Sequence, residues 1–593
     1  MENINLILIV TILGIGILSQ WIAWRIQWPS IVIMSIAGLV IGPVLGVVNP
    51  GEALGDLYSP LISLAVAIIL FEGSSSLDFR EIKDVSKSVF RIVTGGAFIA
   101  WILGSLSAHF IAGLSLELAF IIGGLFVVTG PTVIIPLLRN AKLKQRTAAV
   151  LKWEGIIVDP AGPLLALFAY EVIKVMTKVN SVGYLLTFFS AAFLAIVLGL
   201  ILGFMISMMA NRGFFPEYLK APITLTFVLL CFTIAEVIMH ETGMLAVTVM
   251  GLTLGRAKKH ISALGNISHF VENISVMLTS TVFILLTASL ARETIGQIFT
   301  LPIIAFVLVM LFVVRPLSIW IPTIGTELTK SERTLIGWIA PRGIVALTVA
   351  GYFATTLTDD GFQDADTLVA LTFALVFITV CAHGFTLGPL AKKLGLSNQD
   401  EEGVLIVGAS SFSIALALKL TELGKKVLII DTSKGRLQPA IDRNIQTHEG
   451  EVLSEHVQFE ADLTPYDMIL AMTIDPSYNA LVTQSFAPEF GFNQTFSLFS
   501  GDEQRQASLP SAVKAHLLFD EHAVFTELNR KINTNYDIVT MDMEENQVIT
   551  KDTLPDDTTP LFVKRKNETI EFITQRSRLM LEEGDKLIVL QPK

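Results

Sequence analysis

The sequence predicts a polytopic α-helical membrane region joined to a carboxyl-terminal α/β domain of the Rossmann type. Apolar runs of about 20 residues, long enough to cross a bilayer, recur until about Leu396. Hydrophobic residues make up 52% of the chain, charged residues only 16%, and the mean hydropathy is +0.63. From about Asp400 onward, short strand-like runs alternate with amphipathic ones. We therefore expect a membrane domain over 1–396 and a soluble part after it.

About thirteen segments have the length and composition of membrane-spanning helices. They cover 4–24, 30–48, 58–77, 88–112, 116–138, 146–173, 181–210, 220–239, 243–256, 268–291, 297–322, 333–356 and 366–391. The first run has no basic segment before it and no small-residue cleavage site, so we interpret it as a spanning helix, not a signal peptide. Cys231 and Cys381 lie in apolar segments and predict no disulfide.

The charges of the loops predict the orientation. Basic residues gather in alternate loops, as at Lys83, Lys144 and Arg256, whereas the loop at 51–56 is acidic. Loops rich in Lys and Arg stay in the cytoplasm, which places the amino terminus outside the cell membrane and the soluble part in the cytoplasm. The net charge of −11 lies mostly in that soluble part and argues against nucleic-acid binding.

Three ionisable residues, Glu154, Asp159 and Arg342, lie in the middle of apolar segments. A charge at that depth costs several kcal/mol unless it is paired or lines a wet cavity, so each is a candidate functional residue. Asp159 follows Arg146 by 13 residues, about 20 Å along a helix, which puts it near the bilayer midplane. Glu154 lies about 140° around the same helix from Asp159, so we expect the two carboxylates to have different roles.

Two predicted helices are interrupted by proline and glycine. Gly130 and Pro131 break the fifth segment, and Pro341 and Gly343 flank Arg342 in the twelfth. Such residues interrupt the backbone hydrogen-bond ladder, and in hydrocarbon the freed groups need neighbours or a cavity. Breaks in corresponding positions of two halves indicate an inverted repeat with a binding site where the broken helices cross.

These residues resemble the motifs of the NhaP-type monovalent cation/proton antiporters, across essentially all of the membrane region. The resemblance implies an NhaA-like antiporter fold with crossed broken helices, and exchange by alternating access. It implies that Asp159 binds a cation or a proton competitively, with oxygen ligands from Thr129 and, as a further candidate, Thr132. It also implies that Glu154 pairs with Arg342 to hold the core together, and that the protein is a homodimer.

The chain departs from the family pattern at three positions near this site. It has Gly130 where the family usually has aspartate, Val158 where it has asparagine, and Gly155 where serine is common. One carboxylate, Asp159, therefore remains, which predicts modest affinity and suits K⁺ at least as well as Na⁺. Burial favours the neutral form of a carboxyl group, so one proton competes with one cation, and we expect electroneutral 1:1 exchange.

The soluble part begins with a strand, a turn, a helix and a second strand that ends in an acid. Gly408 opens the turn and Asp431 follows about 23 residues later, as in dinucleotide-binding units. Ser410 and Ser413 replace the second and third glycines of the phosphate loop. This layout, with Asp475 further on, resembles the TrkA-type RCK domains that regulate potassium transport, and predicts a Rossmann-like domain over 403–525 and a smaller subdomain over 530–593. Two roles stay open for this part: binding of a regulatory nucleotide, either an adenine nucleotide or NAD(H), and dimerisation alone.

Two other classes of function compete with the antiporter. An RCK-regulated potassium channel or uptake protein would need a selectivity filter, and the chain has no such motif. A membrane-anchored oxidoreductase would need an intact phosphate loop and catalytic Cys or His residues, so we expect no enzyme. No metal is predicted beyond the transported monovalent cation. The sequence does not decide between K⁺ and Na⁺ or whether the soluble part activates or inhibits.

Overall fold

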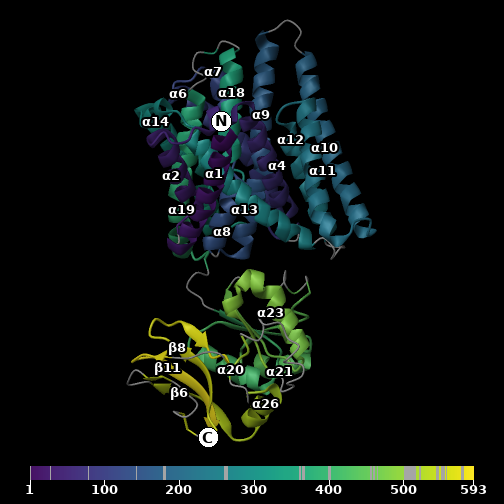
Figure 1. The fold of residues 1–593 in the computed structure, drawn as a ribbon, viewed down its shortest axis with the longest axis vertical. Coiled ribbons are helices and arrows are strands. Elements are labelled where there is room, and N and C mark those ends of the chain that lie inside the picture. Colours follow the sequence, from purple (N-terminus) through teal and green to yellow (C-terminus); the bar gives the residue numbers. More distant parts are fainter. Residues whose placement is uncertain are drawn as a thin grey trace. The chain divides into compact units, whose positions relative to one another are not determined.

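The computed structural model divides the chain into two compact units, Met1–Ser397 and Asn398–Lys593 (Figure 1). It describes residues 2–26, 28–77, 79, 81–141, 143–177, 182–258, 265–359, 362, 367–397, 403–454, 457, 461, 463, 465–499, 516–519, 523–542, 547–548, 554–555, 557–575 and 580–593. Among these residues, nine helices are long and apolar enough to cross a membrane, and four more apolar helices are shorter. Basic-loop residues Arg80, Lys142 and Lys259 lie outside the described residues.

The regular secondary structure described in the first unit consists of helices, apart from an isolated bridge between Leu143 and Ser397. Its helices are α1 (Glu2–Ile26), α2 (Ser30–Leu39), α3 (Pro50–Leu54), α4 (Tyr58–Ser75), α5 (Ser86–Arg91), α6 (Ala97–Phe110), α7 (Leu116–Leu125), α8 (Pro131–Ala141), α9 (Gln145–Thr177), α10 (Val182–Asn211), α11 (Glu217–Ile238), α12 (Thr242–Lys258), α13 (Gly265–Ala288), α14 (Arg292–Ile298), α15 (Leu301–Val309), α16 (Arg315–Trp320), α17 (Lys330–Trp338), α18 (Ile344–Asp359) and α19 (Thr367–Lys393). Each segment predicted from hydropathy overlaps one or more of these helices.

The predicted breaks appear as unwound segments between two pairs of helices. The chain leaves helical geometry between α7 and α8, where Gly130 and Pro131 stand, and between α17 and α18, around Pro341. Proline lacks the amide hydrogen that an uninterrupted helix requires, and its ring disfavours helical backbone at the residue before it. The local sequence therefore ends α7 and α17 in the interior of the unit.

A π-helical turn over Met310–Val314 separates α15 from α16. Pro316 stands in the first turn of α16, directly after Arg315. The missing amide hydrogen of Pro316 accounts for the local change in hydrogen-bond pattern. The same turn orients Arg315, which is buried with 6% of its surface exposed. Arg315 is therefore an interior residue of this unit.

The second unit contains a parallel sheet with strand order β3-β2-β1-β4-β5. Its strands are β1 (Gly403–Val407), β2 (Val427–Asp431), β3 (Gln446–Glu449), β4 (Tyr466–Ala471) and β5 (Thr495–Ser497), and its helices are α20 (Ser411–Glu422), α21 (Lys434–Ile441), α23 (Pro476–Phe490) and α26 (Phe525–Asn533). β1 and β2 are buried along their whole length, as expected for strands covered on both faces. This strand order is that of a doubly wound Rossmann fold up to its fifth strand.

The end of the chain forms a second, antiparallel sheet with order β6-β11-β8-β9 and a two-stranded β10-β7 pair. The strands are β6 (Tyr536–Asp542), β7 (Gln547–Val548), β8 (Thr559–Lys564), β9 (Ile570–Phe572), β10 (Met580–Leu581) and β11 (Lys586–Pro592). One hydrophobic core includes Phe412 of α20, Leu528 of α26, Phe562 of β8 and Ile588 of β11. The Rossmann-like part and the terminal sheet thus share a core and pack as one body.

Candidate functional site

The two helix breaks are in direct contact. The backbone N–H of Gly130, between α7 and α8, donates a hydrogen bond to the carbonyl of Pro341, between α17 and α18, at 3.2 Å. The N–H of Arg342 donates to Thr379 Oγ1 of α19, also at 3.2 Å. Backbone groups freed by the breaks therefore satisfy one another and a neighbouring side chain, which makes irregular backbone tolerable inside this unit.

Arg342 binds the end of α7. Its Nη1 donates to the carbonyl of Val127 at 3.1 Å and to that of Val128. These carbonyls follow the last residue of α7, where a helix leaves unpaired acceptors and the negative end of its dipole. The guanidinium is buried, with 4% of the residue exposed. It therefore stabilises the unwound crossing itself.

Glu154 pairs with Arg315, not with Arg342 as the family resemblance implies. Its Oε1 contacts Arg315 Nη1, and its Oε2 accepts from Nη2 at 2.9 Å. The Nη2 group also donates to the carbonyls of Ile336 and Ile339 at 2.8 and 2.7 Å, at the end of α17. Arg315 thus binds carbonyl groups at the end of α17, as Arg342 binds carbonyl groups at the end of α7. In the sequence, each of the two arginines stands beside a proline in an apolar run, so this pattern does not indicate which of them pairs with Glu154.

Asp159 is fully buried on α9, and neither carboxylate oxygen has a hydrogen-bond partner among the residues that the structure describes. Thr129 lies at the first break, 3% exposed, and its Oγ1 is likewise unpartnered within the described chain. A buried polar group without a partner costs free energy and calls for an explanation such as an ion or water. Thr132 lies in α8, but its side chain is outside the described part of the structure.

The face of α9 that carries Asp159 packs against the first break. Gly155 and Gly162 stand four residues before and three after Asp159, and therefore on the same face of the helix. A Cβ at Gly155 would lie 3.5 Å from the carbonyl oxygen of Thr129, and one at Gly162 only 2.2 Å from a methyl carbon of Val128. Glycine at these positions allows the close approach that turns Asp159 toward the break.

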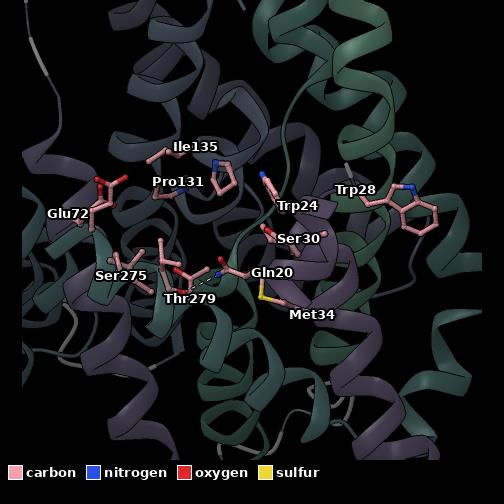
Figure 2. A pocket seen from close by; sticks show the side chains of 16 residues that line it. Gln20, Trp24, Trp28, Ser30, Met34, Glu72, Pro131, Ile135, Ser275 and Thr279 are labelled. Atoms are coloured by element: carbon pink, nitrogen blue, oxygen red, sulfur yellow. Dashed lines mark hydrogen bonds between the residues drawn. The ribbon is translucent and has the colours of Figure 1, made fainter. Parts of the chain in front are cut away.

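A cavity of about 330 Å³ reaches the same break from one side (Figure 2). It lies among α1, α2, α4, α8 and α13, and its lining includes Pro131 of the break. Two carboxylates, Glu72 and Glu272, line it, and its described lining contains no Lys, Arg or His. The remaining lining residues are Gln20, Ala23, Trp24, Trp28, Ser30, Ile31, Met34, Ile69, Ile135, Pro136, Ser275, Val276 and Thr279. The composition favours a cation over an anion. We did not identify Glu72 as a candidate from the sequence, although a carboxylate in an apolar run is the same signal that identified Glu154 and Asp159.

In the second unit, the turn that would bind a pyrophosphate is occupied by the protein's own groups. The N–H of Ser410 donates to Ser413 Oγ at 2.6 Å, and the N–H of Ser413 donates to Ser410 Oγ at 3.1 Å, so that the serines cap α20. The N–H of Ala409 donates to Asp431 Oδ2 at 2.8 Å, and that of Phe412 to Asn529 Oδ1 of α26 at 3.0 Å. A dinucleotide needs these amide donors.

The acid expected at a ribose is also engaged. Asp431 accepts from Arg436 at 2.7 Å and from the N–H of Ser433 at 2.8 Å. Asp475 caps α23 by accepting from the N–H of Ser477 at 2.9 Å. Gly408 keeps its place at the end of β1, with φ of 105°. A cleft of about 290 Å³ lies beside these residues, but they do not fit the pyrophosphate and ribose of a dinucleotide as they stand.

Comparisons with known proteins find relatives of both units. The family model described as sodium/hydrogen exchanger, transmembrane, matches residues 7–393, and the TrkA-N domain model matches 404–504. A probable Na⁺/H⁺ antiporter 2 of Methanocaldococcus jannaschii is 24% identical over 405 residues, covering 64% of this chain and 94% of its own. The K⁺/H⁺ antiporter NhaP of Alkalimonas amylolytica is 25% identical, covering 68% and 69%. The solved sodium proton antiporter MjNhaP1 of M. jannaschii superposes with a TM-score of 0.59 at 23% identity, covering 66% and 99%.

Proposed function

Because the chain belongs to the sodium/hydrogen exchanger transmembrane family, we propose that it is a secondary antiporter that exchanges a monovalent cation, Na⁺ or K⁺, for protons. The observation that carries the proposal is Asp159, a fully buried carboxyl group with no partner on either oxygen within the described residues. It lies against a crossing of two broken helices, where backbone oxygens and Thr129 are within the same small region.

Transport follows from competition for this one carboxyl group. In the protonated form Asp159 is neutral and tolerates its apolar surroundings. When the proton leaves, a dehydrated monovalent cation neutralises the charge, with Thr129 Oγ1 and carbonyls of the break as further oxygen ligands. Because proton and cation exclude each other, one proton moves for each cation and no net charge crosses the membrane. The chain's missing oxygens at Gly130, Val158 and Gly155 lower its affinity for the ion.

The cavity beside Pro131 supports an access route to this site. Its two carboxylates concentrate cations near the break, and its wall carries hydroxyl and amide groups that interact with a partly hydrated ion. Alternating access from an inverted repeat is supported by the matched roles of two arginines. Arg342 caps the helix before the first break, and Arg315 caps the helix before the second.

The topology proposed from the loop charges puts the amino terminus outside the cell membrane and the second unit in the cytoplasm. We assign that unit a regulatory role, as its TrkA-N match suggests. Its occupied phosphate turn argues that regulation does not require a dinucleotide, and homodimerisation is the simplest remaining role. No observation favours the channel alternative, since the exchanger family accounts for the chain from 7 to 393.

The test is transport in proteoliposomes with a pH-sensitive dye inside. Addition of K⁺ or Na⁺ to wild-type protein should drive proton movement whose rate does not change with an imposed membrane potential. Asp159→Asn should abolish it, whereas Glu293→Gln, at an exposed carboxylate of α14, should leave it intact. Proton movement that persists in Asp159→Asn, or current that follows the ion gradient, would contradict the assignment.

A further inference from the structure

The turn between α11 and α12 holds a buried carboxyl group that the transport site does not use. Glu241 is 6% exposed, and its Oε2 has no hydrogen-bond partner among the described residues. Its backbone is left-handed, with φ of 68°, a conformation that a residue with a side chain adopts rarely. The fold therefore holds Glu241 in an unfavourable backbone conformation while its carboxyl group is kept from water.

A second carboxylate organises the turn around Glu241. Glu236, in the last turns of α11, accepts hydrogen bonds from the N–H of Glu241 at 3.0 Å and the N–H of Gly243 at 3.1 Å. Its Oε1 also lies 3.3 Å from Nδ1 of His240. Glu236 is thus engaged on both oxygens, and its negative charge lies beside Glu241. Two adjacent carboxylates disfavour simultaneous ionisation.

Aromatic rings connect this turn to the helices of the transport site. The ring of His240 stacks on Tyr352 of α18, with centroids 5.0 Å apart and an interplanar angle of 28°. Tyr352 contacts Phe353 at 5.4 Å, and Phe353 contacts Tyr170 of α9 at 6.0 Å. α9 carries Asp159, and α18 begins directly after the second break. The turn therefore contacts α18 directly and α9 through the rings of Tyr352 and Phe353.

The titratable groups around Glu241 and the nearby Tyr352 come from three helices. α11 contributes Glu236, whose charge acts on Glu241. α9 contributes Glu171, whose charge acts on Tyr352, and Lys174, which lies near Glu171 with its Nζ 4.0 Å over the ring of Tyr170. α18 contributes Tyr352, whose hydroxyl lies within the field of all three carboxylates. Burial, and then the charge of Glu236, raise the pKa of Glu241 to about 8. The carboxyl group of Glu241 thus changes charge within the range of pH values that cells and their surroundings reach.

We propose that Glu241 is a second protonation site, separate from Asp159, which controls the docking of the α11–α12 turn on α18. When protonated, Glu241 is neutral and stays in its buried position, and the stack of His240 on Tyr352 is maintained. When the proton is lost, the carboxylate is repelled by Glu236 and turns toward water, so that the turn and the stack loosen. The effect of Glu241 on transport rests on the proposed antiport function, whereas the protonation of Glu241 and the docking of the turn do not.

The experiment is hydrogen–deuterium exchange of the peptide around 236–244 in reconstituted full-length protein, measured across a series of pH values and corrected for intrinsic exchange. In wild type we expect protection to fall several-fold with a midpoint near pH 8, the pKa of Glu241. Glu241→Gln should keep protection at every pH, and Glu236→Gln should move the midpoint by about one pH unit because it changes the neighbouring charge. Glu117→Gln, at an exposed carboxylate of α7, is the matched control.

The same variants are then assayed for ion-driven proton movement. We expect the wild-type rate to change across the same midpoint and Glu241→Gln to remove that change. The transition in exchange should persist in Asp159→Asn, which does not transport, so failure of antiport and failure of this site are distinguishable. A wild-type turn whose protection does not change across pH 8, or a transition unaltered in both Glu241→Gln and Glu236→Gln, would overturn the proposal.

Discussion

Replacing Arg315 by methionine tests the pairing that the structure assigns to Glu154. The substitution keeps much of the side-chain volume but removes the charge and the donors. It leaves the buried Glu154 carboxylate without its cation and the carbonyls of Ile336 and Ile339 without a donor. The loss therefore acts on the ion pair and on the end of α17 together.

The magnitude follows from these contacts. Removing one partner of a buried ion pair costs about 3–5 kcal/mol. Each carbonyl left unpaired adds about 1–3 kcal/mol where water does not reach it. We therefore expect Arg315→Met to lower the free energy of unfolding by at least about 5 kcal/mol. Arg91→Gln, which removes a hydrogen bond to the carbonyl of Ile324 at the surface, should cost about 1 kcal/mol or less.

The assay is a double-mutant cycle on protein in mixed micelles, unfolded by a titration with SDS and followed by tryptophan fluorescence. Glu154→Gln combined with Arg315→Met should show a coupling free energy of about 2–3 kcal/mol. The same cycle with Arg342→Met should show less than half of that, because Arg342 binds backbone carbonyls and not Glu154. A larger coupling with Arg342 than with Arg315 would refute the reasoning.

Three further outcomes follow from the structure. Gly162→Leu should prevent stable folding or abolish transport, because even its Cβ would lie 2.2 Å from a methyl carbon of Val128, whereas Gly183→Ala, in open space, should change neither thermal stability nor transport. Millimolar NADH should leave the thermal unfolding of the full-length protein unchanged, since Ser413, Asp431 and Asn529 already accept hydrogen bonds from the amides that a pyrophosphate needs; a clear rise in the midpoint would contradict this. Because the pKa of Glu241 is raised from 4.5 to about 8, the native state holds a proton that the unfolded state has lost between those values. The free energy of unfolding should therefore fall as pH rises across that range, and chemical unfolding at several pH values should show a flatter dependence in Glu241→Gln.

The positions of the broken helices could be predicted from sequence because their cause is local. Pro131 and Pro341 lack the amide hydrogen that a continuous helix requires, and each has glycine within two residues, so the sequence marks both places as weak points of a helix. The lengths of the apolar segments are equally local, since they depend on the thickness of the bilayer core. The order of strand, turn, helix and acid from Gly408 to Asp431 likewise predicted the parallel sheet. These features needed no knowledge of which segments meet.

Contacts between distant segments were decided by the tertiary structure alone. Arg315 and Arg342 carry the same sequence signal, a cation beside proline in an apolar run, and only the packing of α9, α16 and α17 selects Arg315 for Glu154. The phosphate turn is closed by Asn529, which lies 117 residues after its partner Phe412. Sequence by itself determined where this chain must break and which charges must be buried, because backbone chemistry and desolvation act at each residue. Which buried charge finds which partner depends on helix packing, and that is a property of the whole unit.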